Sequence, residues 1–480
     1  MIERERPAFP IDFLKDLIRK LRIPGRRDGG SDRFPGPSSE NLADDVLRVQ
    51  VGVIRKAFKA AGLDVAGAPI EGKRRVVDDA DVRYLYRPGH ILARREDVGR
   101  LREFFESEEN QKRFRGKLDA RETRVPGLVL AVLPSRTDEQ DDVLATLVEV
   151  EDGGFLERGA ATPDHVVYVT PKGYLCPATE PEVPRSRRPW PPPTPYDREI
   201  TDEKTKIRVT VVDSGLWKDA VGSAESPWLE TDDVFAGNED LEQVIPTKIH
   251  EYAGHGTFVA GVISCIAPET RIDVEAALPY GGAVFESDIV DQIQDALEEN
   301  KPQIISISAG THTRDNHELL SLVLLAQNNK FDENDDVLIV AAAGNDSSND
   351  PFYPAASAKD YPWVVSVGSV DPDKKVSDFS NFGKDWVSVY ARGRNLVNAF
   401  PKGTYTCHEP PNKGKVRKFD GLAQWSGTSF STPIVTGLIA AEMRDNGLTA
   451  RAAWDVVRQT AITEYDARIG EDIQIVGPLT

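Results

Sequence analysis

Three side chains that together perform nucleophilic hydrolysis occur at the edges of predicted elements in the second half of the chain. Asp213 ends the apolar run VTVVDSG, His255 lies between glycines in GHGTFVAG, and Ser429 follows Gly-Thr in WSGTSFSTPIVTG. A serine hydroxyl is a weak nucleophile until a base accepts its proton, and a neutral imidazole suits that role near pH 7. A carboxylate holds the imidazole tautomer and stabilises the imidazolium that forms. These residues predict a site for acyl transfer.

A fourth motif, VAAAGND, supplies a candidate donor for the oxyanion of such a reaction. It runs from a predicted strand into Gly344 and Asn345, whose side-chain amide can stabilise developing negative charge. Ser429 opens a predicted helix, so its own backbone N–H and the helix dipole add to that stabilisation. Each motif alone has a structural explanation, such as a turn cap or a helix N-cap. Their joint occurrence favours catalysis.

The elements around these motifs are those of a parallel α/β sheet, with buried apolar strands separated by helices and glycine turns. Parallel strands end at the same edge of a sheet, so this arrangement is expected to bring the motifs together. The predicted strands are 208–212, 271–276, 304–308, 337–342 and 364–367, and the predicted helices are 256–264, 287–300, 317–328, 429–445 and 449–460.

The first part of the chain predicts a second, smaller α/β domain. Strand-like and helix-like stretches alternate from residue 84 to residue 170, as in a small open-faced sandwich with helices on one side. Two amphipathic helices are expected before it, at 11–23 and 40–61. The stretch TEPEVPRSRRPWPPPTP after it predicts an extended, solvated linker. The expected parts are a helical arm at 1–65, the small domain at 66–178, the linker at 179–199 and the main domain at 200–480.

The four motifs resemble those of the subtilisin-like (subtilase) serine peptidases over about residues 205–460. The resemblance implies a subtilisin-like three-layer α/β fold with a mostly parallel sheet. It implies that Asp213, His255 and Ser429 form the catalytic triad, and that Asn345 and the Ser429 N–H form the oxyanion hole. By its position and layout, the small domain is similar to the propeptide that precedes many relatives.

The resemblance also implies how an extended substrate binds. The backbones of residues 308–310 and 343–344 are expected to pair with it by strand addition. Tyr353–Pro354 resembles a family turn that is often cis. Phe352 stands where the family usually has a small residue, so we expect it to shorten the primary pocket and favour small or medium residues. The substrate-binding set is Ser308, Ala309, Gly310, Ala343, Gly344, Phe352 and Glu286.

Two departures from the family pattern bear on metal binding and on activity. Phe258 replaces a second histidine that is not catalytic, so activity is still expected. Residues 264–268 run almost directly into the next strand, where relatives often carry a calcium-binding loop. We therefore expect no cofactor, calcium being the one metal that the family suggests.

Charge is distributed unevenly along the 480 residues. The chain has 59 basic and 78 acidic side chains, a net charge of −19, yet residues 1–200 carry 35 of each and residues 201–350 carry 9 basic and 29 acidic groups. No basic face dominates either half, which argues against nucleic acid or anionic lipid as a partner. The resemblance places Glu286 near the rim of the cleft. One hypothesis is that this acidic side selects Arg or Lys upstream of the cleaved bond. The alternative is a solubilising surface.

Features of the whole chain favour a cytoplasmic location. The three cysteines show no framework spacing and are expected to be free thiols. The N-terminal stretch mixes charged and apolar residues, unlike a secretory signal, and no apolar run approaches the roughly 20 residues that span a bilayer.

The sequence thus predicts a cytoplasmic serine endopeptidase that acts on extended polypeptides and is regulated by its N-terminal domain, through which a regulatory protein could act. Two alternatives remain open. One is a partner-activated maturation or defence protease with a narrow substrate range. The other is a catalytically idle module that binds peptides.

Overall fold

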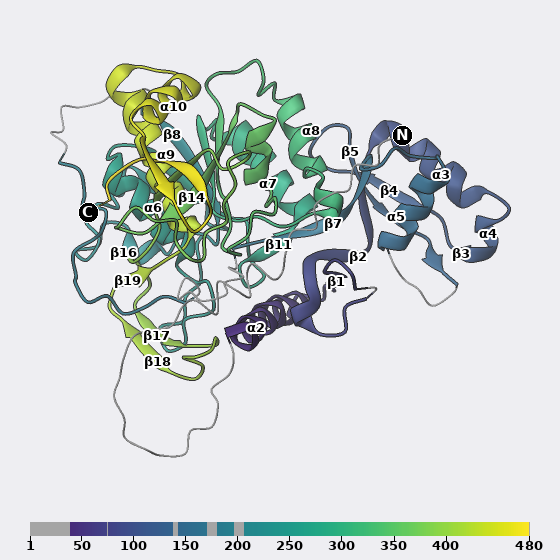
Figure 1. Cartoon of the computed structure of the whole chain (residues 1–480), viewed down its shortest axis with the longest axis horizontal. Coiled ribbons are helices and arrows are strands. Elements are labelled where there is room, and N and C mark those ends of the chain that lie inside the picture. Colours follow the sequence, from purple (N-terminus) through teal and green to yellow (C-terminus); the bar gives the residue numbers. More distant parts are fainter. Residues whose placement is uncertain (1–38, 74, 138–142, 170–179, 196–205, 480) are drawn as a thin grey trace. The chain divides into compact units, whose positions relative to one another are not determined.

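A nine-stranded sheet carries the motifs in the computed structural model, which describes residues 39–479 except 74, 138–142, 170–179 and 196–205 (Figure 1). The strand order is β20-β21-β15-β14-β13-β12-β8-β10-β9, and every pair is parallel except β20–β21. The mostly parallel sheet is therefore confirmed. Its strands are β8 Arg208–Asp213, β9 Val234–Phe235, β10 Arg271–Ala276, β12 Ile304–Ile307, β13 Leu338–Ala342, β14 Val364–Val370, β15 Val389–Arg392, β20 Ile462–Asp466 and β21 Glu471–Ile475.

Helices cover both faces of this sheet and complete three layers. Successive side chains of a strand point to opposite faces. Val211 of β8 accordingly packs in one core with α6, α9 and α10, whereas Val212 packs in the other with α7 and α8. These helices are α6 His255–Ile266, α7 Glu286–Glu299, α8 Leu320–Asn328, α9 Thr428–Asn446 and α10 Ala450–Gln459. All five were predicted from the apolar pattern, with ends shifted by at most a few residues.

A second sheet, of order β11-β7-β2-β5-β4 with β1 paired to β2, is built mostly from the small N-terminal region (Figure 1). Its outermost strand, β11, comes from the main C-terminal part of the chain and pairs antiparallel with β7. The two regions therefore share one sheet. Its strands are β1 Ala66–Pro69, β2 Val82–Arg94, β4 Asp119–Glu122, β5 Leu128–Val132, β7 Ala161–Tyr168 and β11 Ala283–Phe285.

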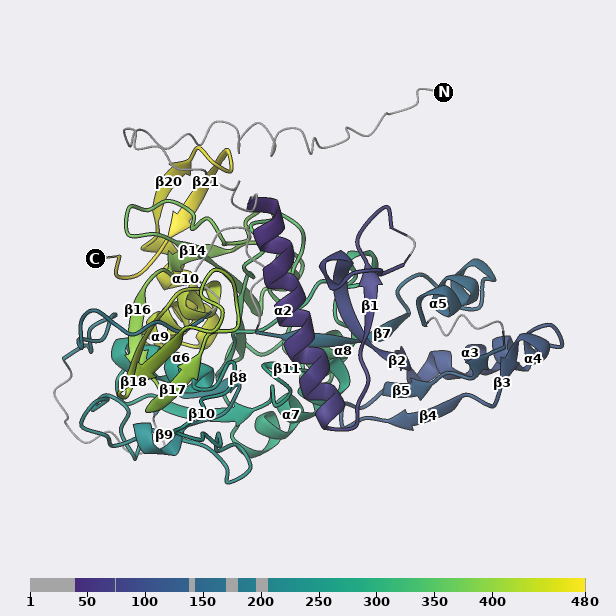
Figure 2. The same cartoon turned by 90° about the horizontal axis from the view of Figure 1, so that it is seen from below.

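Helices pack on both sides of this second sheet. The helices α3 (Val98–Glu106) and α5 (Val143–Asp152) share a core with β2 and β5. The long helix α2 (Ser39–Ala60) packs on β2, β7 and β11 through Leu47, Val51, Ile54 and Phe58, and Figure 2 shows it running beside β11. Val167 of β7 points the other way, into the core formed by α7 and α8. Residues 39–480 form one compact unit, and the predicted domain boundaries stay a prediction. The helix expected at 11–23 lies outside the described residues.

The Pro-rich segment, predicted as an extended, solvated linker, is exposed at residues 183, 185–188 and 192–195 but is bonded to neighbouring strands at two points. Glu182 pairs with Gln424 of β19 (Leu422–Trp425), and Trp190 pairs with Val397 of β16 (Leu396–Ala399). The Arg392 guanidinium lies 3.7 Å from the centroid of the Trp190 ring, a cation–π contact. Residues 180–195 therefore follow the surface of the main C-terminal part of the chain.

The remaining short α-helix and strands are α4 Asn110–Arg113, the pair β3 Phe114–Arg115 and β6 Ser135–Arg136, and the hairpin β17 Gly403–Thr406 and β18 Val416–Phe419.

Candidate active site

Asp213 and His255 form a buried hydrogen-bonded pair. The carboxylate oxygens of Asp213 lie 2.7 and 2.9 Å from Nδ1 of His255, which donates to them in the tautomer that leaves Nε2 free to accept a proton. Asp213 is fully buried at the end of β8, and His255 is 3% exposed at the first residue of α6. A Cβ added to Gly256 would lie 2.6 Å from the Gly215 carbonyl oxygen. The glycine after the histidine is therefore required for α6 to approach β8.

Ser429 is the second residue of α9 and is held against the end of β12. Its hydroxyl donates to the Ser308 carbonyl at 3.2 Å, and the Ser308 hydroxyl donates to the Ser429 carbonyl at 2.9 Å. The neighbouring Phe430 ring packs 5.2 Å from the His255 ring, so the start of α9 lies against the start of α6. The hydrogen bond of the Ser429 hydroxyl goes to Ser308, and for His255 to accept that proton the hydroxyl must turn towards the imidazole.

Asn345 is oriented so that its amide N–H groups are available as donors. Its side-chain oxygen accepts from the backbone N–H of Thr428 at 2.8 Å and from the Thr428 hydroxyl at 3.1 Å. Because those two bonds occupy the oxygen end, the NH₂ end faces away from Thr428. This arrangement can stabilise an oxyanion formed at the adjacent Ser429.

The edge at residues 308–310 is already paired with the protein's own chain. Gly310 and Tyr168, at the end of β7, exchange two N–H···O bonds of 3.0 Å, and the Val169 N–H donates to the Gly282 carbonyl at 2.9 Å. The end of β7 thus lies between two backbone edges, of which the one at Gly310 was predicted to pair with a substrate strand and the one at Gly282 was not. Ala309, between Ser308 and Gly310, is buried.

The edge predicted at residues 343–344 is not available for pairing, which corrects that expectation. The Ala343 N–H donates to the Val367 carbonyl and the Ala343 carbonyl accepts from the Asn381 side chain. The Gly344 N–H donates to the Thr428 hydroxyl, and its carbonyl accepts from the Asn381 N–H. These residues can line a pocket, but strand addition would have to displace existing bonds.

Phe352 lies between the two predicted edges. A Cβ added to Gly310 would lie 2.3 Å from the Phe352 ring, and one added to Gly344 would lie 3.0 Å from it. The ring is 4% exposed and packs edge-on against Tyr168. This position fits the pocket role expected for Phe352, which stays a prediction. The Tyr353–Pro354 bond is cis, as expected.

Glu286 is not on an exposed rim, which corrects the prediction for that residue. Its side chain is fully buried, accepts from His165 Nδ1 of β7 at 2.8 Å and accepts from the Ser321 N–H at 3.2 Å. In this form of the chain the carboxylate is bound to the N-terminal region and cannot meet a basic substrate residue.

Two residues that help to build the site escaped prediction. Thr428 holds Asn345, and its place inside the GTS motif beside Ser429 was an available signal. Asn381 holds Ala343 and Gly344 from a loop with no local pattern, and its side-chain oxygen also accepts from the Asp346 N–H at 2.7 Å. Nothing in the sequence around Asn381 indicates this role.

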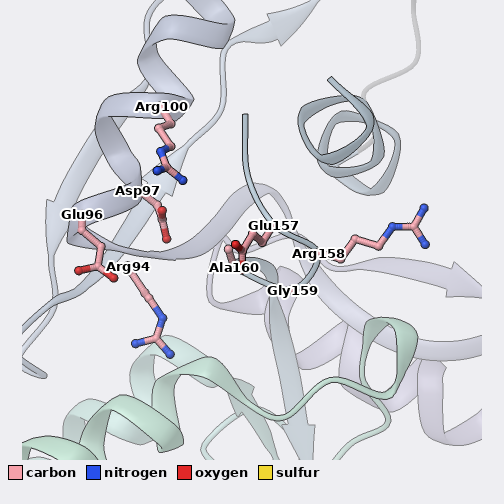
Figure 3. Close-up of a pocket in the computed structure, with 8 residues that line it drawn as sticks. All are labelled: Arg94, Glu96, Asp97, Arg100, Glu157, Arg158, Gly159 and Ala160. Carbon is pink, nitrogen blue, oxygen red and sulfur yellow. The ribbon is translucent and has the colours of Figure 1, made fainter. Parts of the chain in front are cut away.

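A surface hollow of about 490 Å³ lies on the N-terminal region (Figure 3), and none of the triad residues lines it. Arg94, Glu96, Asp97 and Arg100 line one side and residues 157–160 line the other. Acidic and basic groups alternate around it, and the Arg158 guanidinium points away from those of Arg94 and Arg100. The hollow therefore does not favour an anionic ligand over a cationic one, or the reverse.

The described residues include no group of three or more His, Cys, Asp or Glu side chains arranged to hold a metal ion. No helix in those parts of the chain has the length and apolar character needed to cross a bilayer.

Comparison with known proteins gives consistent similarities. A family model described as "Subtilase family" matches residues 204–474, more than half of the chain. The intracellular serine protease of Paenibacillus polymyxa is 28% identical over 251 residues, covering 49% of this chain and 65% of that protein. The major intracellular serine protease of Bacillus subtilis (strain 168) is 32% identical over 208 residues, covering 40% and 56%.

Among solved structures, the patellamide maturation protease PatA is 26% identical, with a TM-score of 0.41 over 55% of this chain and 90% of that one. The chain spans less than two thirds of the length of the curated relatives it matches.

Proposed function

The chain belongs to the subtilase family, and from that membership we propose that it is a serine endopeptidase acting on extended polypeptides through an acyl-enzyme on Ser429. The observation that carries this proposal is the buried Asp213–His255 pair, with its 2.7 and 2.9 Å contacts, together with Ser429 at the start of the helix that packs against α6 and an oriented Asn345 amide.

The chemistry follows from these groups. His255 Nε2 takes the Ser429 proton while Oγ attacks the substrate carbonyl, and Asp213 stabilises the imidazolium. The oxyanion of the tetrahedral intermediate accepts from the Asn345 amide and the Ser429 N–H. The intermediate expels the amine, which takes its proton from His255, and leaves an ester on Ser429. Water, activated by His255 in the same way, then releases the acid and restores the hydroxyl.

Regulation by the N-terminal region is the second part of the proposal. The end of β7 pairs with Gly310 and Gly282, where a substrate strand would bind, and so blocks the cleft. Buried polar contacts hold β7 in place. The Asp164 carboxylate accepts from the N–H and hydroxyl of Ser287 at 2.9 Å, and His165 binds Glu286. Until this region is cleaved or displaced, the enzyme is latent.

Displacement by a protein partner would make the chain a partner-activated protease with a narrow substrate range. The pairing of the end of β7 with Gly310 and Gly282 is the observation that favours this version over a constitutively open protease. The presence of all four catalytic groups argues against an idle peptide-binding module. A cytoplasmic location is supported by the names of two relatives, which are intracellular serine proteases.

Labelling with a fluorophosphonate, which reacts with an activated serine, tests the catalytic part. We expect slow labelling of the wild type, which becomes complete as the N-terminal region is cleaved or displaced, and none of Ser429→Ala. Absence of any Ser429-dependent labelling, before and after prolonged incubation of the full chain, contradicts the proposal.

A proline in β7 tests the regulatory part. Tyr168→Pro removes the N–H that donates to Gly310, so labelling should become faster than in the wild type. The matched control is Val77→Pro, at a 79% exposed residue of the same region, which should label at the wild-type rate. Equal rates for Tyr168→Pro and the wild type would show that β7 does not block the site.

A further inference from the structure

Glu242 lies behind the Asp213–His255 pair, and the chemistry above gives it no role. Its Oε2 atom accepts the backbone N–H of Gly254 at 2.6 Å, and its carboxyl group also bonds the Ser214 side chain. Gly254 precedes His255 and is the N-cap residue of α6, with a left-handed φ of 80°. As a glycine it has no side chain with which to cap the helix.

Ser214 connects this carboxyl group to the other side of His255. Its hydroxyl accepts the Gly256 N–H at 3.1 Å, and its own N–H donates to Asp213 Oδ1 at 2.7 Å. The first N–H groups of a helix have no partner within it. Here Glu242 and Ser214 supply partners for the residues immediately before and after His255.

The segment that carries Glu242 is itself bonded to the segment that follows Asp213. The Glu242 N–H donates to the Leu216 carbonyl at 2.9 Å, and the Leu216 N–H donates to the Asp240 carbonyl at 3.0 Å. The carboxyl group therefore joins two elements, the chain after β8 and the start of α6. These are the elements that bring Asp213 and His255 together.

Within the described residues, no basic side chain is among the groups that shift the pKa of the Glu242 carboxyl group. Burial is the main cause that raises the pKa of its carboxyl group to about 8, and the nearby Asp213 raises it further, against the hydrogen bonds from Gly254 and Ser214. The group is therefore largely neutral at pH 7 and becomes an anion as the pH rises past 8. A second negative charge near Asp213 would stabilise the imidazolium form of His255.

We propose that Glu242 is a positioning residue for the general base, holding the start of α6 so that His255 Nδ1 meets both oxygens of Asp213. The inference rests on the proposed function only in assigning His255 as the base. The contacts themselves are independent of activity.

The first test reads the geometry directly in the full chain and needs no substrate. Proton NMR detects the Nδ1 proton of His255 as a downfield signal, which is identified by its loss in His255→Ala. We expect Glu242→Ala to lose or broaden this signal and Glu242→Gln to retain it, because a glutamine oxygen still accepts the Gly254 N–H. The control Glu239→Ala, an exposed residue of the same segment, should leave it unchanged. A sharp, unshifted signal in folded Glu242→Ala overturns the proposal.

The second test uses peptide hydrolysis over a range of pH. Glu242→Ala should lower kcat about 10- to 100-fold with little change in KM, since misplacing a catalytic group costs rate and not substrate binding. Glu242→Gln should restore most of kcat at pH 7, and any step in kcat near pH 8 that comes from ionisation of Glu242 should be absent from this variant. Wild-type kcat and pH profile in both variants would refute the role of Glu242. If the wild type is never labelled at Ser429, the proposed function is refuted. The NMR test does not depend on activity, so it still decides whether Glu242 positions His255.

Discussion

The Thr428 hydroxyl provides a sharp test of how the oxyanion donor is held, through the variant Thr428→Val. Valine has the same shape but removes two hydrogen bonds, the one donated to Asn345 at 3.1 Å and the one accepted from the Gly344 N–H at 3.2 Å. The Thr428 backbone N–H still donates to Asn345 at 2.8 Å. The amide therefore loses one of its two anchors.

The size of the effect follows from these bonds. A buried Gly344 N–H without a partner costs about 1–3 kcal/mol of stability. Loss of the whole amide donor costs about 2.7–4 kcal/mol of transition-state stabilisation, the range established for subtilisin itself. With one anchor left, we expect about half of that or less, close to a tenfold fall in kcat, or about 1.4 kcal/mol. KM should change little, because the oxyanion exists only along the reaction path.

Hydrolysis of a fluorogenic peptide, together with denaturant unfolding, measures both effects. Thr428→Ser keeps the hydroxyl and should remain close to wild type in kcat, and Asn345→Ala should lose about 10²- to 10³-fold. If Thr428→Val retains full kcat while Asn345→Ala does not, the hydroxyl does not hold the amide. If Asn345→Ala also retains full kcat, Asn345 is not the oxyanion donor.

Three further predictions concern the contacts between the N-terminal and peptidase regions and the floor of the cleft. Burial, with the charges of Glu286 and Asp288, raises the pKa of Asp164 to about 7, so the folded state binds a proton more tightly than the unfolded state. The free energy of unfolding should therefore fall as the pH rises from about 4 to about 7, and Asp164→Asn should flatten that slope in denaturant titrations. Arg314→Leu breaks a buried bidentate pair with Glu151, of 2.8 and 2.6 Å, and should cost about 3–5 kcal/mol in the same titrations. Adding Glu151→Leu should recover part of that loss, and no recovery would show that the cost is not an unpaired charge. Phe352→Ala should shift cleavage in a peptide library towards larger residues before the cut, whereas an unchanged preference would remove Phe352 from the pocket.

The catalytic groups could be identified from the sequence because their requirements are local. Asp213 must follow a buried strand, and Gly256 must be a glycine because any side chain there would collide with Gly215. Buried parallel strands such as β8 and β13 are continuous apolar runs, so they and the helices between them are visible without a structure. The chain order of these elements then places their ends at one edge of the sheet.

Strands that depend on a distant partner could not be predicted in this way. The three residues of β11 form a strand because β7 pairs with them, and nothing in their own sequence indicates it. The composition of the Pro-rich segment predicts a solvated chain. In the structure, however, the Trp190 backbone pairs with Val397 and its ring makes a cation–π contact with the Arg392 guanidinium.

The sequence by itself indicated the candidate triad, the oxyanion candidate and the parallel sheet, since apolar periodicity and flanking glycines encode them over short stretches. Only the tertiary structure decided that β7 pairs with Gly310, that Glu286 is buried against His165, and that Glu242 bonds the Gly254 N–H at the start of α6. The physical reason is that the sequence looks the same whether a carboxylate lies on an exposed rim, in a buried pair or at the start of a helix. The residues that surround it come from distant parts of the chain, and they determine which of these positions it occupies.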